Sequence, residues 1–152
     1  MKRILLTLPI IVIGMLFGNH AAAQDYRFAA GLRLSNSSPT LNTGISAKYF
    51  ATDKTAIEGL LSFGSRFGIG GLLEVNNSLG SPGLSWFYGG GVYLGFQDHD
   101  TYFGPTGIIG LDYTFQNAPV NLSIDWKPEL DITPAVNFVP DAFALSIRFA
   151  LK

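Results

Sequence analysis

Residues 143–151 read FALSIRFAL, and a large apolar side chain occupies every second position of this stretch. In an extended chain successive side chains point to opposite faces, so one face would be apolar while the other carries Arg148 among small residues. The preceding segment 120–127 (VNLSIDWK) and the distant segment 26–34 (YRFAAGLRL) show the same alternation. This pattern predicts three β-strands that each have an apolar and a charged face.

Five further stretches with a period of two lie between these three, and the segments that separate them are rich in residues that favour turns. The eight predicted strands are 26–34, 43–50, 56–64, 68–76, 84–96, 106–115, 120–127 and 143–151. A strand that crosses a bilayer at a tilt takes about 9–11 residues, so eight strands use roughly 80 residues. The sequence therefore predicts an all-β fold, an eight-stranded antiparallel up-and-down barrel whose longest connections are 97–105 and 130–141.

The first residues have the order of a secretory signal peptide. Lys2 and Arg3 precede an apolar run at 4–17, and the small residues 21–23 (AAA) fit the cleavage rule for such peptides. The apolar run contains Pro9 and is shorter than the roughly 20 residues of a membrane-spanning helix. We therefore expect a cleaved signal peptide at 1–23 and one barrel domain at 24–152.

The composition is unusual for a protein surrounded by water. Charged residues make up 14% of the chain, whereas soluble domains contain about 25%. The chain has no cysteine, so the exported domain has no disulfide to stabilise it. Without Lys2 and Arg3 eight basic residues face eleven acidic ones, a net charge of about −3, which predicts no binding to nucleic acid.

Twelve aromatic residues fall near the ends of the predicted strands, on their apolar faces. They are Tyr26, Phe28, Tyr49, Trp86, Tyr88, Tyr113, Phe115 and Phe149 at the end where both termini lie, and Phe63, Phe96, Trp126 and Phe143 at the opposite end. Two aromatic girdles of this kind are typical of barrels that span a membrane, because amphipathic rings prefer the depth of the lipid headgroups.

The polar faces of the strands carry five residues of each charge. The positive residues are Arg27, Arg33, Lys48, Lys127 and Arg148, and the negative residues are Glu58, Glu74, Asp112, Asp125 and Glu129. An eight-stranded barrel has a narrow interior, so charges that face inward must pair. We predict a charge network inside the barrel. A secreted lipocalin-like barrel is the alternative, in which the apolar faces would point inward and bind an apolar ligand.

The alternating strands resemble those of small outer-membrane barrels of the OmpA and OmpX type, in the style of the short barrel proteins of Bacteroidetes. The resemblance covers nearly all of 24–152 and is clearest at 26–34, 120–127 and 143–151. It implies a location in the outer membrane of a Gram-negative bacterium. The partners it implies are outer-membrane lipid and the assembly machinery that inserts such barrels.

Some outer-membrane barrels of this size are enzymes that modify lipid A, with a histidine beside a serine and an acidic residue. His20 would leave with the signal peptide, so His99, between Asp98 and Asp100, is the one candidate for a base or a metal ligand. A solvated loop tip is the favoured interpretation of these three residues. The sequence predicts no catalytic residue, no metal and no cofactor.

These observations favour a structural or surface-interaction role, in which outer loops meet a partner and the interior is closed by salt bridges. Three alternatives stay open: an enzyme that modifies lipid A, a lipocalin-like binder of apolar ligands, and a narrow pore.

Overall fold

The computed structural model describes residues 26–36, 40–140 and 142–151, and the predicted signal peptide at 1–23 lies outside them. Within these ranges the chain forms ten strands and no helix. The strands are β1 (Phe28–Ser35), β2 (Gly44–Phe50), β3 (Thr55–Phe63), β4 (Phe67–Ser78), β5 (Leu84–Gln97), β6 (Asp100–Thr114), β7 (Val120–Trp126), β8 (Glu129–Asp131), β9 (Asn137–Val139) and β10 (Phe143–Leu151).

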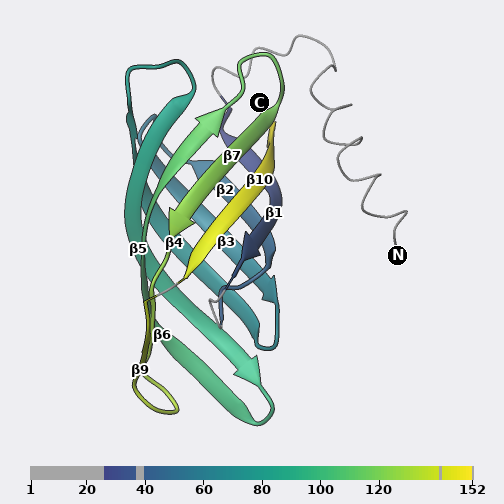
Figure 1. Cartoon of the computed structure of the whole chain (residues 1–152), viewed down its shortest axis with the longest axis vertical. Coiled ribbons are helices and arrows are strands. Elements are labelled where there is room, and N and C mark those ends of the chain that lie inside the picture. The colour runs from purple at the N-terminus through teal and green to yellow at the C-terminus, as the bar shows by residue number, and fades with distance from the viewer. Residues whose placement is uncertain (1–25, 37–39, 141, 152) are drawn as a thin grey trace, which may run out of the picture.

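Eight of the strands close into a barrel (Figure 1). Their order is β5-β4-β3-β2-β1-β10-β7-β6, and β5 also pairs with β6, which joins the two edges. Every neighbouring pair is antiparallel. The predicted eight-stranded antiparallel up-and-down barrel is therefore confirmed. Closure satisfies the backbone hydrogen bonds of all eight strands and leaves the barrel wall without a free edge.

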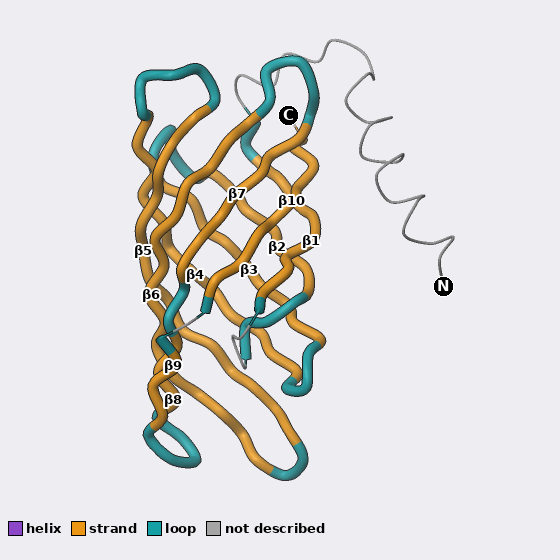
Figure 2. Tube along the Cα trace, in the orientation of Figure 1, coloured by secondary structure: helices purple, strands orange, loops and turns teal. Residues whose placement is uncertain are grey.

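The two ends of the barrel differ in their connections (Figure 2). β1 begins where β10 ends, since Phe28 lies opposite Leu151, and we call this the termini end. Three turns, at 51–54, 79–83 and 115–119, connect strands there. At the other end, which we call the far end, the connections are 36–43, 64–66, 98–99 and the segment 127–142, which contains β8 and β9. The far end thus has both the longest connection, 127–142, and the two shortest ones, 64–66 and 98–99.

The prediction of a loop over 130–141 is wrong, because this segment contains a small hairpin. β8 pairs with β9, and β8 also pairs with β6 where Thr106 lies opposite Glu129. Each of the two strands has three residues. That length is too short for a period of two to be recognised, and Pro134 and Pro140 favour a loop on sequence grounds.

The prediction of a loop over 97–105 is also wrong. β5 continues to Gln97 and β6 begins at Asp100, so a two-residue turn joins them. Asp98 adopts a left-handed conformation in this turn, with φ of 55°. Pro105 favours a loop on sequence grounds because it has no N–H to donate, yet it lies within β6 opposite Val92. In consequence the β5–β6 hairpin extends beyond the other strands at the far end (Figure 1).

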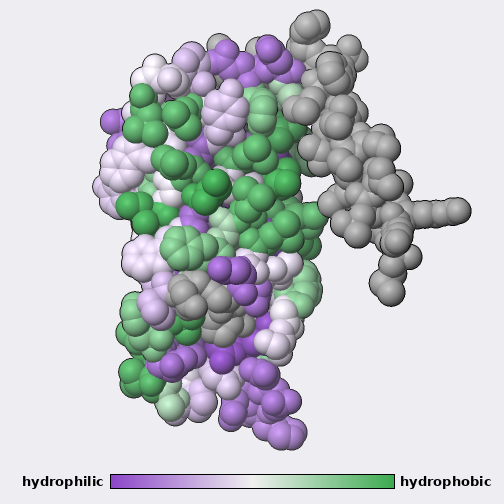
Figure 3. All heavy atoms as spheres, in the orientation of Figure 1, coloured by the Kyte–Doolittle hydropathy of each residue, from purple (hydrophilic) through white to green (hydrophobic). Residues whose placement is uncertain are grey.

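The outer face of the barrel is apolar around its whole circumference. Residues of β10 alternate between exposed and buried, with the large apolar side chains exposed. Leu32 on β1 is 63% exposed and Ile124 on β7 is 61% exposed. Hydrophobic side chains gather over the strands in Figure 3, between more hydrophilic ends. This arrangement is the reverse of a soluble barrel, in which the apolar face points inward.

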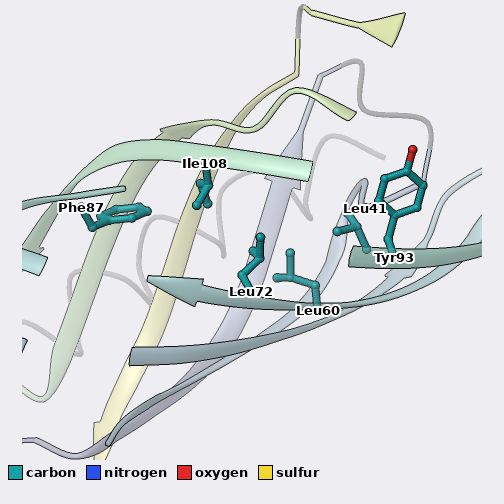
Figure 4. Packing of buried hydrophobic residues seen from close by; sticks show 6 residues of the cluster. All are labelled: Leu41, Leu60, Leu72, Phe87, Tyr93 and Ile108. Carbon is teal, nitrogen blue, oxygen red and sulfur yellow. The ribbon is translucent and has the colours of Figure 1, made fainter. Parts of the chain in front are cut away.

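A small apolar core fills part of the interior. Its members are Leu41, Leu60, Leu72, Phe87, Tyr93 and Ile108, all of them buried. Figure 4 shows these six side chains inside the barrel, with Leu41 beside Tyr93 at one side and Phe87 at the other. Leu60 and Leu72 come from β3 and β4, and Ile108 comes from β6. Two groups of buried charged residues lie beside this core, one toward each end of the barrel.

Candidate functional site: the charged interior

The first charged group lies toward the termini end, beside Leu72 and Phe87 of the apolar core. We call it the termini-side cluster, and it consists of Lys48, Glu58, Glu74, Asp112 and Arg148, all at most 3% exposed. Five different strands supply these residues, β2, β3, β4, β6 and β10. Sequence analysis predicted that all five face inward, and the strand alternation places them there.

Arg148 makes the largest number of contacts in this cluster. Its Nη2 donates to Glu58 Oε1 in a salt bridge. Its Nη1 donates to Asn121 Oδ1 at 3.0 Å and to Ser123 Oγ at 2.9 Å, and its Nε donates to Ser46 Oγ at 2.6 Å. A planar guanidinium suits this role because it presents several donors in fixed directions. Arg148 therefore links four barrel strands through one side chain.

Lys48 is the second cation of the termini-side cluster. Its Nζ lies 2.9 Å from Glu74 Oε2 and 3.2 Å from Asp112 Oδ2. It also lies 4.4 Å from the centre of the Phe87 ring, a favourable position for a cation above an aromatic face. Lys48 thus connects the cluster to the apolar core beneath it.

The second charged group, which we call the far-side cluster, lies between the core and the far end. Arg33 donates to both oxygens of Asp125, at 2.7 and 2.8 Å, in a two-pronged salt bridge. Lys127 donates to Glu129 Oε1 at 2.8 Å. All four side chains are at most 2% exposed. The structure therefore brings together residues of β1, β7, β8 and, in Lys127, the β7–β8 connection, all of which sequence analysis assigned to the interior.

A third ion pair of the far-side cluster was missed by sequence analysis. Arg66 lies 3.3 Å from Asp131, and the Tyr93 hydroxyl donates to Asp131 Oδ1 at 2.8 Å. The Arg66 guanidinium also lies 3.2 Å from the centre of the Tyr102 ring. Arg66 and Asp131 fell in predicted turns, outside the alternating strands. Sequence alternation could not identify them, because their contact spans 65 positions of the chain.

Residues Thr40 and Leu41 turn into the barrel and close its far half. Both are fully buried. Their backbone N–H groups donate to Glu129, Thr40 N to Oε2 at 3.1 Å and Leu41 N to Oε1 at 2.8 Å. Glycines of β4 leave the space that these two residues occupy. A Cβ at Gly68 would lie 2.3 Å from the Thr40 carbonyl oxygen, and one at Gly70 would lie 2.7 Å from a Leu41 methyl carbon.

Replacing Gly70 with valine is expected to push Leu41 out of the barrel and to lower the free energy of unfolding by about 1–3 kcal/mol, the usual cost of overpacking. Urea unfolding of the refolded barrel measures the change. Gly71→Val is the matched control, because Gly71 is exposed and a Cβ there would meet nothing within 4 Å. A Gly70→Val barrel as stable as the Gly71→Val barrel would contradict this account.

Two predictions at the start of β1 are wrong. Arg27 is exposed and lies outside the buried network, and Tyr26 is turned toward the barrel mouth instead of the outer face. The chain bends at Arg27, before β1 begins at Phe28, so the alternation stops there. The Tyr26 ring meets Phe50 edge to face, with centroids 5.4 Å apart. Burial and the nearby Asp112 carboxylate raise the pKa of the Tyr26 hydroxyl to about 12.

Tyr26 and Arg27 line a cavity of about 880 Å³ that opens at the termini end. Asp112 also lines it, so the cavity reaches down to the termini-side cluster. Polar side chains such as Asn76 and Thr114 form much of the wall. The cavity is a polar vestibule above the charged cluster, in contrast to the apolar pocket expected of a lipocalin-like binder.

The other predicted aromatic residues lie toward both ends of the barrel. At the termini end Phe28, Tyr49, Tyr88, Tyr113 and Phe149 are exposed, Trp86 and Phe115 are half-buried, and at the far end Phe63, Phe96, Trp126 and Phe143 are exposed. Phe67, which fell in a predicted turn, is also exposed and stands 6.0 Å from Phe63 and 6.4 Å from Phe96 between ring centroids.

His99 is exposed at the tip of the β5–β6 hairpin. Among residues 26–36, 40–140 and 142–151, no three His, Cys, Asp or Glu side chains are grouped so that they could hold a metal ion. In the same ranges, no helix has the length and apolar character needed to cross a membrane. His99 thus belongs to neither of the two buried charged clusters.

Comparison with known proteins finds no matching family model, no matching curated sequence and no matching solved structure. The fold class therefore rests on the strand pairing alone: the described chain is a closed eight-stranded antiparallel β-barrel.

Proposed function

We propose that this protein is an outer-membrane barrel of a Gram-negative bacterium, exported by the signal peptide at 1–23, with a structural or surface-interaction role. The observation that carries the proposal is the polarity of the barrel wall. Large apolar side chains cover the outside, while five buried cations and six buried carboxylates lie within the barrel or at its far end. Lipid is the solvent that such an outer face requires, because in water this much exposed apolar surface would drive association.

The same polarity argues against a lipocalin-like binder. Such a barrel needs an apolar cavity to receive its ligand. Here ion pairs occupy the interior, and the cavity at the termini end has a polar wall.

The closed far half also favours a structural role over a pore, since Thr40 and Leu41 lie within the barrel against Glu129. We expect planar bilayers that contain the protein to show little conductance.

The far end supports the surface-interaction part of the proposal. The β5–β6 hairpin extends beyond the other strands, and the β8–β9 hairpin lies beside it. Together they form a small sheet that would stand outside the membrane if both termini face the periplasm. Phe103 and Phe138 are 40% and 57% exposed on it. Exposed apolar residues outside a membrane are candidates for contact with a partner.

Heat-modifiable migration tests the proposal. Protein folded in detergent micelles should give a β-rich circular dichroism spectrum and run at a different position on a gel when it is not boiled, because a closed barrel resists dodecyl sulfate. The refolded chain should also partition into phosphatidylcholine vesicles. A protein that stays monomeric and folded in plain buffer without detergent would overturn the proposal.

Replacing His99 with alanine is expected to leave lipid A unchanged and the barrel intact. His99 is exposed at a hairpin tip, and a solvated tip tolerates such changes. The measurement is mass spectrometry of lipid A from cells that carry the wild-type gene, the variant or a deletion. A change in lipid A acylation that depends on His99 would favour an enzyme and contradict the proposed role.

A further inference from the structure

The buried charges of the barrel do not balance. Among the described residues five buried cations stand against six buried carboxylates. The far-side cluster is balanced, because each of its cations has its own carboxylate. Its pairs are Arg33 with Asp125, Lys127 with Glu129, and Arg66 with Asp131. The surplus negative charge therefore falls in the termini-side cluster, which has two cations and three carboxylates.

Neither cation of the termini-side cluster removes this surplus. Arg148 pairs with Glu58, and Lys48 divides its charge between Glu74 and Asp112. Arg33 also acts on Glu58, but it is bonded to both oxygens of Asp125. Arg27, at the mouth, is exposed to water, which screens its charge. A buried charge that no partner neutralises is strongly unfavourable, and a carboxylate in that position gains a proton instead.

Two carboxyl groups of the cluster face each other. Glu58 on β3 and Glu74 on β4 point into the barrel from diagonal positions of adjacent strands, Glu58 opposite Leu72 and Glu74 opposite Ala56, and their carboxyl groups interact. Within the described part of the chain, Glu58 Oε2 and Glu74 Oε1 accept no hydrogen bond, while Glu74 Oε2 lies 2.9 Å from Lys48 Nζ. Both side chains are at most 1% exposed. The two carboxyl groups therefore lack a hydrogen-bond donor between them.

We propose that Glu58 and Glu74 share one proton in the folded barrel at neutral pH. A proton on one carboxyl supplies an O–H that donates to the other, and it removes the surplus negative charge. Two adjacent carboxyl groups in a buried site do not both ionise. The charged and titratable groups that face the pair are Lys48 from β2, Asp112 from β6, Arg148 from β10, Arg33 from β1, which is paired with Asp125, and, at the mouth, Tyr26. The proposal concerns the interior alone and does not depend on the membrane.

Infrared spectroscopy of the folded protein in detergent tests this directly. At neutral pH the wild-type barrel should show the carbonyl stretching band of a protonated carboxyl group. Glu74→Gln, which mimics the protonated side chain, should abolish that band. Asp53→Asn, which changes an exposed carboxylate, is the matched control that should keep it. A wild-type barrel without the band overturns the proposal, and so does a band that persists in Glu74→Gln.

Urea unfolding as a function of pH gives a second readout. An ordinary carboxyl group loses its proton near pH 4.3, so above about pH 5 the folded barrel would hold one proton more than the unfolded chain. Its unfolding equilibrium constant should then rise about tenfold per pH unit relative to that of Glu74→Gln. Parallel pH profiles for the two proteins contradict the proposal. Stabilisation by sodium at constant ionic strength, without the infrared band, would show that a cation takes the proton's place.

Discussion

Replacing Arg148 with alanine should lower the free energy of unfolding by about 3–5 kcal/mol, the range measured when one partner of a buried ion pair is removed. Arg148 is 2% exposed and holds Glu58, Asn121, Ser123 and Ser46 in place. Without the guanidinium Glu58 loses its cation, and the cluster loses one of its two positive charges. Urea unfolding in detergent micelles measures the change. The urea concentration at the midpoint should fall, while the dependence of the unfolding free energy on urea stays the same.

Two control variants separate charge from packing at Arg148. Arg148→Lys keeps the charge but loses the fixed fork of donors, so we expect an intermediate loss. Arg148→Met combined with Glu58→Leu removes both charges and should recover much of the stability, since apolar replacement of a whole buried pair is often neutral. Arg27→Ala, at an exposed position, should change little. An Arg148→Ala barrel as stable as the wild type would show that the interior pairs contribute nothing.

Replacing Leu32 with arginine should cost about 2–4 kcal/mol in a lipid bilayer, the value found for a cation near the middle of a membrane barrel. Leu32 lies in the middle of β1, is 63% exposed and stands between Ile45 and Ile147 on the neighbouring strands. In water the same change at an exposed position alters stability by less than about 0.5 kcal/mol. The measurement is urea unfolding of the barrel folded in phosphatidylcholine vesicles.

Val136→Arg is the matched control for this prediction. Val136 lies between β8 and β9 at the far end and is 78% exposed. The proposed orientation puts it outside the hydrocarbon, so the substitution should have little effect. Equal effects of Leu32→Arg and Val136→Arg would mean that the outer face of β1 does not contact lipid.

The barrel itself was predictable because its strands carry one repeated signal. In β10 every second residue from Phe143 to Leu151 is large and apolar, and the residues between them are small or charged. The period of two residues determines which side chains share a face of the strand. Arg148 was therefore predicted to point to the opposite face from its neighbour Ile147. Closure and strand number followed from the count of such segments and from their lengths.

The residues that sequence analysis placed wrongly or missed lie where the alternation of apolar and polar residues stops. The bend at Arg27 turns Tyr26 toward the barrel mouth, and three-residue strands such as β8 and β9 show no period. Thr40 and Leu41 enter the barrel through contacts with Glu129, a residue 89 and 88 positions away. Local patterns carry no information on contacts at such separations, so the residues that fill the far half could be identified from the structure alone.

The proposed function depends on what surrounds the apolar outer face, and alkaline carbonate extraction of washed membranes addresses this most directly. Carbonate at high pH releases proteins that are held at a membrane by charge, but it does not remove proteins whose apolar surface is embedded in lipid. We expect the chain to remain in the membrane pellet. Its appearance in the soluble fraction, folded and monomeric, would contradict the account.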